Sequence, residues 1–156
     1  MSAARTLARC AAVAMLAIAG MLPPGAAAAD ARTADDAALS RAEWQAVRQV
    51  VGDQLDALRA GDALQAFSYA APGIRERFGT AENFLRMVRG SYTSLLRARA
   101  VEFLPGTVVE GAVVQPVRLL ANDDLVEVAL YSVEKQRDGR WMITGCTLAP
   151  SKLRSV

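Results

Sequence analysis

Apolar residues recur at steps of three and four over residues 41–60, which is the pattern of one face of an α-helix. Ser40 and Glu43 have the spacing of a capping box, in which each side chain satisfies an unpaired amide at the helix start. Gly61 is a typical residue at which a helix stops. We therefore expect a helix from about residue 40 to 60 that docks through its apolar face. That face carries Trp44, Val47, Val51, Leu55 and Leu58.

Two shorter helices are expected next, because Asp62 and Thr80 are suitable N-caps for the apolar segments that follow them. The second of these ends at Gly90, and a segment over residues 92–96 leads out of it. Pro72-Gly73 between them predicts a turn. The apolar positions of the two helices are Leu64, Phe67, Tyr69, Phe84, Met87 and Val88.

Beyond residue 97 the apolar pattern changes to alternation, which indicates β-strands. The strands are expected at 98–104, with a kink at Pro105-Gly106 and a continuation at 107–110, and then at 112–121, 125–136 and 140–148. Asp138-Gly139 is typical of a two-residue type I′ hairpin turn. Helices followed by such strands predict an α+β fold, with N-terminal helices packed on a four-stranded antiparallel meander.

Turn positions also predict the strand register. With Asn122-Asp123 as a two-residue turn, Arg118 would lie opposite Glu127, a favourable cross-strand ion pair. With Asp138-Gly139 as the next turn, Tyr131 would lie opposite Cys146 and Val133 opposite Thr144. Pro116 lacks an N–H group, so we expect its strand to be unpaired or bulged on the side of the first strand.

This register separates a strongly apolar sheet face, which should receive the helices, from a mixed face. The first carries Val117, Leu119, Val126, Val128, Leu130, Trp141 and Ile143. The mixed face is predicted to be a contact surface, above all for a homodimer. Two alternatives stay open: an ordinary mixed surface, or an inverted register in which this face lines the core. The candidate contact residues are Arg118, Glu127, Tyr131 and Met142.

The N-terminus has the organisation of a cleavable signal peptide over residues 1–29. Arg5 and Arg9 precede an uncharged stretch at 10–22, which is too short for a spanning helix, and Ala27-Ala28-Ala29 precedes Asp30. We expect a flexible lead-in at 30–39, one domain at 40–150 and a tail at 151–156. Export to a periplasm is the expected destination, with no membrane span after cleavage.

Composition excludes several classes of chemistry. Removal of 29 residues leaves 127, with 16 basic and 16 acidic side chains, so a nucleic-acid partner is not expected. The sequence has no histidine, which excludes a Ser-His-Asp or Cys-His nucleophile. Cys146 would be the one cysteine left and is interpreted as a buried thiol of low reactivity. No cofactor or metal motif is present.

The chain from Leu55 to Pro150 resembles an exported bacterial family, the domain of unknown function 4864. The resemblance rests on residues 70–75 (AAPGIR) with 78–79, 101–103 (VEF), 114–117 (VQPV), 129–131 (ALY), 138–141 (DGRW) and 145–146. Such sequences are similar in outline to the nuclear-transport-factor-2-like, cystatin-like cone, in which helices pack on a curved sheet. The resemblance implies this fold and implies no activity.

Two functions remain open. One is a non-catalytic envelope module that binds a small apolar ligand, a protein partner or its own copy. The other is a proton-transfer enzyme, an isomerase or dehydratase, with its pocket inside the cone, as in some relatives of this fold. Candidate pocket residues are Tyr69, Tyr92 and Glu134. Catalysis would require an ionisable group buried in a closed pocket.

Overall fold

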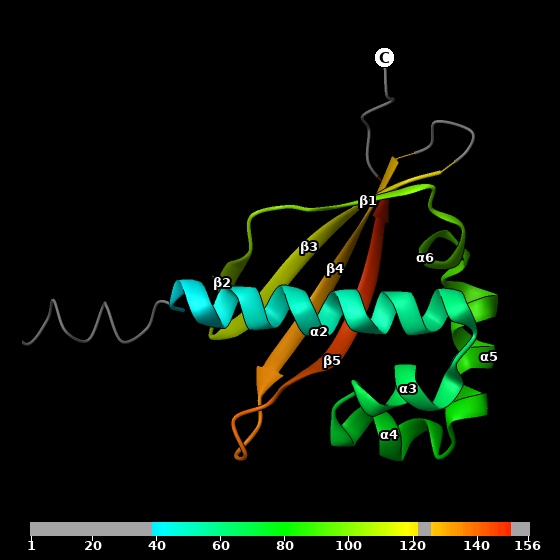
Figure 1. Ribbon diagram of the computed structural model, residues 1–156, viewed down its shortest axis with the longest axis horizontal. Coiled ribbons are helices and arrows are strands. Elements are labelled where there is room, and N and C mark those ends of the chain that lie inside the picture. Colours follow the sequence, from blue (N-terminus) through cyan, green and yellow to red (C-terminus); the bar gives the residue numbers. More distant parts are fainter. Residues whose placement is uncertain (1–38, 122–125, 151–156) are drawn as a thin grey trace, which may run out of the picture. The chain divides into compact units, whose positions relative to one another are not determined.

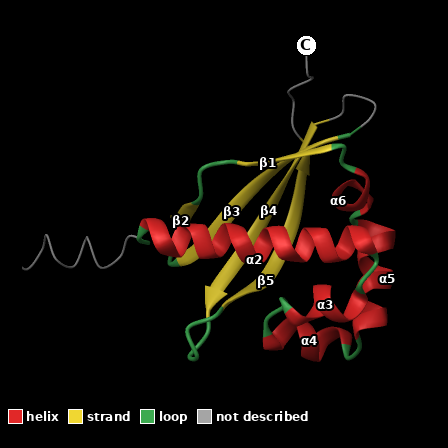
Figure 2. Cartoon of the chain, viewed as in Figure 1, coloured by secondary structure: helices red, strands yellow, loops and turns green. Residues whose placement is uncertain are grey.

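The computed structural model describes residues 39–121 and 126–150. Five helices precede the strands in this part of the chain, and the strands form one antiparallel sheet (Figures 1 and 2). The α+β class is therefore confirmed. The elements are α2 (Arg41–Ala60), α3 (Ala63–Ser68), α4 (Pro72–Phe78), α5 (Ala81–Ser91), α6 (Thr93–Arg97), β1 (Ala100–Phe103), β2 (Thr107–Val109), β3 (Ala112–Leu120), β4 (Val126–Lys135) and β5 (Trp141–Pro150).

The long helix α2 has both predicted ends. The Ser40 hydroxyl accepts from the Glu43 amide at 3.2 Å, and the Glu43 carboxylate accepts from the Ser40 amide at 3.0 Å. Gly61 ends the helix in the left-handed conformation, with φ of 73°. Glu43 also accepts from Lys135 at 2.9 Å, and this bond, with those from Ser40, lowers the pKa of its carboxyl to about 2. The start of α2 is thereby tied to the far end of β4.

The apolar face of α2 lies against the sheet, as predicted. Val47, Val51, Leu55 and Leu58 are buried, and Trp44 packs half-buried on the same core. All the helices of the described chain lie on one face of the curved sheet (Figures 1 and 2).

The connection after α3 differs from the expected turn. Pro72 is the first residue of α4, where its missing N–H group costs no hydrogen bond and its fixed φ suits a helix start. Residues 93–97, within the segment expected to lead out of the helices, form the short helix α6. The caps predicted for the other two helices are present: Asp62 accepts from Gln65 and Thr80 from Asn83. Leu64, placed on the apolar positions of α3, is instead 74% exposed.

The first strand is split in two, as the Pro105-Gly106 signal predicts. β1 and β2 pair with the same edge of β3, and the kink between them lies opposite Gln115 and Pro116. The Gln115 side chain donates to Leu104 O at 2.7 Å and to Pro116 O at 2.9 Å, which ties the kink to β3. Pro116 therefore sits where no ladder amide is needed.

The type I′ geometry occurs in a different hairpin from the expected one. Glu110 and Gly111, between β2 and β3, both have positive φ, of 51° and 82°, as a type I′ turn requires. At Asp138-Gly139 the prediction was wrong: Gln136 pairs with Arg140 across three residues, and only Gly139 has positive φ.

The predicted register between β3 and β4 is wrong by one residue. Arg118 lies opposite Val128, and Leu119 opposite Glu127. Leu120 pairs with Val126, so five residues connect the strands, and the expected turn at 122–123 falls outside the described residues. The reason is that Arg118 finds its carboxylate on the other neighbouring strand, where Glu102 is directly opposite and 2.6 Å away. The ion pair of Arg118 therefore forms across β1 and β3 and not across β3 and β4.

The β4–β5 hairpin contains a β-bulge, and the bulge restores the predicted pairing of the two strands. Beyond the three-residue turn Val133 pairs with Ile143, but past the irregularity at Ser132/Val133 the strands follow the predicted pairing, with Tyr131 opposite Cys146. The outer edge of β5 is covered at Ile143, whose amide donates to Tyr69 O and whose carbonyl accepts from Ala71 N. An edge that would otherwise present free backbone groups is thus paired.

The signal peptide, most of the lead-in and the tail lie outside the described residues, so those boundaries stay predictions. Within residues 39–121 and 126–150, no helix has the length and hydropathy to span a membrane.

A candidate ligand cavity between the helices and the sheet

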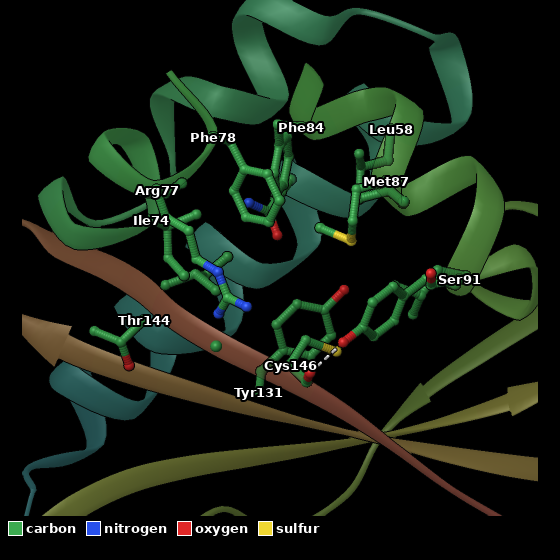
Figure 3. Close-up of a pocket in the computed structure, with 17 residues that line it drawn as sticks. Leu58, Ile74, Arg77, Phe78, Phe84, Met87, Ser91, Tyr131, Thr144 and Cys146 are labelled. Carbon is green, nitrogen blue, oxygen red and sulfur yellow. Dashed lines mark hydrogen bonds between the residues drawn. The ribbon is translucent and has the colours of Figure 1, made fainter. Parts of the chain in front are cut away.

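A cavity of about 390 Å³ lies between β5 on one side and α4 and α5 on the other (Figure 3). Its wall is mainly apolar, with a few polar groups. Such a composition is typical of sites for small molecules, which range over roughly 300–1,000 Å³. The lining residues are Gln54, Leu58, Ala70, Ile74, Arg77, Phe78, Phe84, Met87, Val88, Ser91, Tyr92, Leu95, Tyr131, Ile143, Thr144, Gly145 and Cys146.

The helix α4 is held away from the middle of the sheet by its attachment to the edge of β5. The bonds of Ile143 to Tyr69 and Ala71 fix the residues just before α4 on that edge. Within α4, Ile74, Arg77 and Phe78 share one face because they are three and four residues apart. Phe78 meets Phe84 of α5 with ring centroids 5.7 Å apart in an edge-to-face arrangement. The aromatic contact joins the two helices above the cavity.

The central polar group of the cavity is the hydroxyl of Tyr131. The tyrosine is 1% exposed, and its hydroxyl has no nitrogen or oxygen hydrogen-bond partner among the described residues, only the weakly bonding thiol of Cys146 beside it. Figure 3 shows the side chain rising from β4, with the hydroxyl directed into the cavity on the side of Met87. Burial, together with the neighbouring Cys146 thiol, raises the pKa of Tyr131 well above its usual value. The group is therefore a neutral donor at any ordinary pH.

Cys146 and Tyr92 form the adjoining part of the wall. The Tyr92 hydroxyl donates to Cys146 O at 2.9 Å, so this tyrosine is satisfied where Tyr131 is not. Burial raises the pKa of the Cys146 thiol to about 12, although a hydrogen bond with the Tyr131 hydroxyl acts in the opposite direction. The thiol is thus protonated and weakly nucleophilic. Cys146 was expected to be buried, and it is partly buried.

The remaining polar groups differ in depth. Gln54 is buried, and its amide donates to Ala66 O at 3.1 Å. Arg77 is exposed, reaches the cavity from α4, and lies 5.7 Å from the centroid of the Phe78 ring. Arg77 is the one charged residue among the described residues that line the cavity.

The predicted contact surface is not a surface in the structure. Tyr131 and Met142 are 1% and 3% exposed. With the register shifted by one residue, Arg118 lies on the open face of the sheet, whereas Tyr131 faces the helices. The alternative in which this tyrosine lines the core is the one that the structure supports.

Of the three candidate pocket residues, only Tyr92 reaches the cavity. The Tyr69 hydroxyl accepts from Gln65 Nε2 at 3.0 Å, at a separate hollow beside α2. Glu134 is exposed near the β4–β5 turn and lines a third hollow, separate from that of Tyr69. The structure therefore does not bring Tyr69 and Glu134 together as a proton-transfer pair.

The cavity itself offers little acid–base chemistry. Its described lining contains no Asp or Glu, and the pKa values of Tyr131 and Cys146 are both raised away from neutrality. No group of three or more metal-ligating side chains occurs within residues 39–121 and 126–150. The arrangement is suited to holding a molecule by apolar contact and one hydrogen bond.

The sequence analysis missed Arg77 and Tyr131 as cavity residues. Arg77 was not among the candidate residues, although its spacing from Ile74 and Phe78 places all three on one side of α4. Tyr131 was placed on the wrong face by the register error.

Comparison with known proteins gives a family and no function. Residues 40–156 match the model of a family described as a domain of unknown function, DUF4864. No curated protein and no solved structure matches the chain. The match covers most of the sequence, so the chain belongs to this family. The similarity to the nuclear-transport-factor-2-like cone stays a prediction.

Proposed function

We propose that this member of the family is a non-catalytic binding module, which holds a small, mainly apolar molecule in the cavity between β5 and the α4–α5 pair. The observation that carries the proposal is the Tyr131 hydroxyl. A buried polar group without a partner costs roughly 1–3 kcal/mol, and proteins rarely retain one. A ligand with one hydrogen-bond acceptor, such as a carbonyl or ether oxygen, would satisfy it once a covering side chain moves aside, because the hydroxyl itself has almost no accessible surface.

The surroundings of Tyr131 support the same occupant. Phe78, Phe84 and Met87 would contact an apolar body, and thioether and aromatic groups adapt well to varied shapes. If the predicted leader is removed, the site would serve in the periplasm. We propose that location as the place of action.

The test is binding of 6-propionyl-2-(dimethylamino)naphthalene, a neutral fluorophore whose emission moves to the blue in apolar surroundings and whose ketone can accept from Tyr131. We expect saturable binding with a blue shift. Met87→Trp, which fills the cavity, should weaken binding by at least tenfold. Leu64→Trp adds the same side chain at an exposed position of α3 and should leave binding unchanged.

Tyr131→Phe separates the hydrogen bond from the apolar contact. Loss of one bond worth about 0.5–1.5 kcal/mol should weaken binding of the ketone by about 2- to 12-fold. Equal binding by wild type and Met87→Trp would show that the probe binds elsewhere and would refute the proposal.

A further inference from the structure

We infer that the ligand is an anionic amphiphile whose acidic group lies at the Arg77 end of the cavity, while its apolar body lies over Tyr131. This inference rests on the proposed function and adds the charge and orientation of the ligand. It concerns a free small molecule with a carboxylate, sulfonate or phosphate group.

The sign of the ligand's charge follows from Arg77, the one charged residue in the described lining of the cavity. Arg77 projects from α4 towards the cavity (Figure 3). Its guanidinium has no acidic partner among the described residues, only the ring of Phe78 beneath it. By contrast, Arg118 and Arg140 each have an acidic partner. Arg118 is paired with Glu102 at 2.6 Å, and Arg140 with Asp138 at 2.7 Å. A guanidinium at the rim of an apolar cavity favours an anion and disfavours a cation.

The orientation follows from burial. Arg77 is exposed, whereas Tyr131 is buried, so these two polar groups of the cavity differ in their access to water. A charged group keeps most of its hydration at the Arg77 end and would lose it beside Tyr131. The acidic end therefore belongs at Arg77, and an uncharged oxygen within the apolar body is suited to Tyr131.

The size of the cavity limits the class further. About 390 Å³ is near the lower end of the range for small-molecule pockets. This volume favours a compound with one short chain or with two or three rings over a two-chain lipid.

The test uses two fluorophores that differ by one sulfonate. N-phenyl-1-naphthylamine is neutral, and 1-anilinonaphthalene-8-sulfonate has the same rings with an anionic group. We expect wild type to bind the sulfonate more tightly. Arg77→Gln should weaken the sulfonate by about 2- to 5-fold, the range for an exposed ion pair, and leave the neutral probe unchanged. The preference should fall as salt rises.

Two matched variants complete the experiment. Arg77→Lys keeps the charge and should retain the preference. Arg86→Gln removes a charge from an exposed position of α5 that does not line the cavity, and should behave as wild type.

Each other outcome is decisive. If both probes bind and Arg77→Gln changes neither, the inference is overturned while the proposed function stands. If neither probe binds, both fall. Flotation with phosphatidylglycerol vesicles that is lost in Arg77→Gln would assign the guanidinium to a lipid surface and would also overturn the inference.

Discussion

The two halves of the space between helices and sheet are packed differently. Under the first half of α2 the packing is tight: Val47 and Val51 are fully buried, and a Cβ placed on Gly106 would lie 2.1 Å from the Trp44 ring. Under α4 and α5 the same sheet faces a cavity of about 390 Å³.

The contrast shows where stability and binding are located. Tight packing is the ordinary state of a protein interior, and gaps larger than a water molecule are few. The filled half therefore supplies most of the stability, while the hollow half gives up contacts that a ligand could restore. Four measurements would test this division.

The largest effect is expected from a charge in the filled half. Val51→Asp buries a carboxylate where no partner or water is available and should lower the free energy of unfolding by about 4 kcal/mol or more. Met87→Asp, in the wall of the cavity, should cost clearly less because water can reach it. Denaturant unfolding of both variants measures this, and equal losses would abolish the distinction.

Adding one methyl group should show the tight packing of the filled half by a smaller margin. Gly106→Ala forces the kink and the Trp44 ring apart and should cost about 1–3 kcal/mol, the usual cost of overpacking. Gly145→Ala, whose methyl would lie in open space on the face of the sheet that Ser132 shares, is the control and should be neutral or slightly stabilising. Thermal melts of the two variants give the comparison, and a destabilised Gly145→Ala with an unaffected Gly106→Ala would reverse our assignment.

Stability should also fall at alkaline pH because of the Cys146 thiol. Its pKa is raised from 9.0 to about 12 in the folded state, so folding favours the protonated form. This contribution is complete below pH 9 and is lost as pH rises towards 12, by about 1 kcal/mol between pH 9 and 10. Urea midpoints of wild type should decline over that interval more steeply than those of Cys146→Ala. Parallel pH profiles would count against a buried thiol.

The smallest expected effect is on the free energy of unfolding, which two tyrosine variants should change in opposite directions. Tyr131→Phe removes a buried hydroxyl without a partner and should raise the free energy of unfolding by up to about 1 kcal/mol. Tyr92→Phe breaks the bond to Cys146 O and should lower it by a similar amount. Changes of the same sign in both variants would show that the Tyr131 hydroxyl is satisfied in solution.

Local signals predicted most of the elements. The Ser40 cap, the Gly61 stop and the alternation after residue 97 each depend on neighbours in sequence, and the structure confirms all three. Their success reflects the short range of capping and of strand periodicity.

The cavity could not be predicted in the same way, because it depends on which strands pair and in which register. A single-residue slip between β3 and β4 moved Tyr131 from the expected surface into the core. The attachment of residues 69–71 to β5 joins segments more than 70 residues apart, and no local pattern indicates it. The sequence therefore predicts the apolar faces of the helices and strands, but it does not predict the cavity between them.

The same attachment has a kinetic consequence. The bonds of Ile143 to Tyr69 and Ala71 close a loop of more than 70 residues, and contacts of such separation are slow to form. We expect the wall of α4 to join the sheet late in folding and to detach before the sheet itself unfolds. Hydrogen exchange at the Ala71 and Ile143 amides would report such partial openings, which would also be the route by which a molecule enters or leaves.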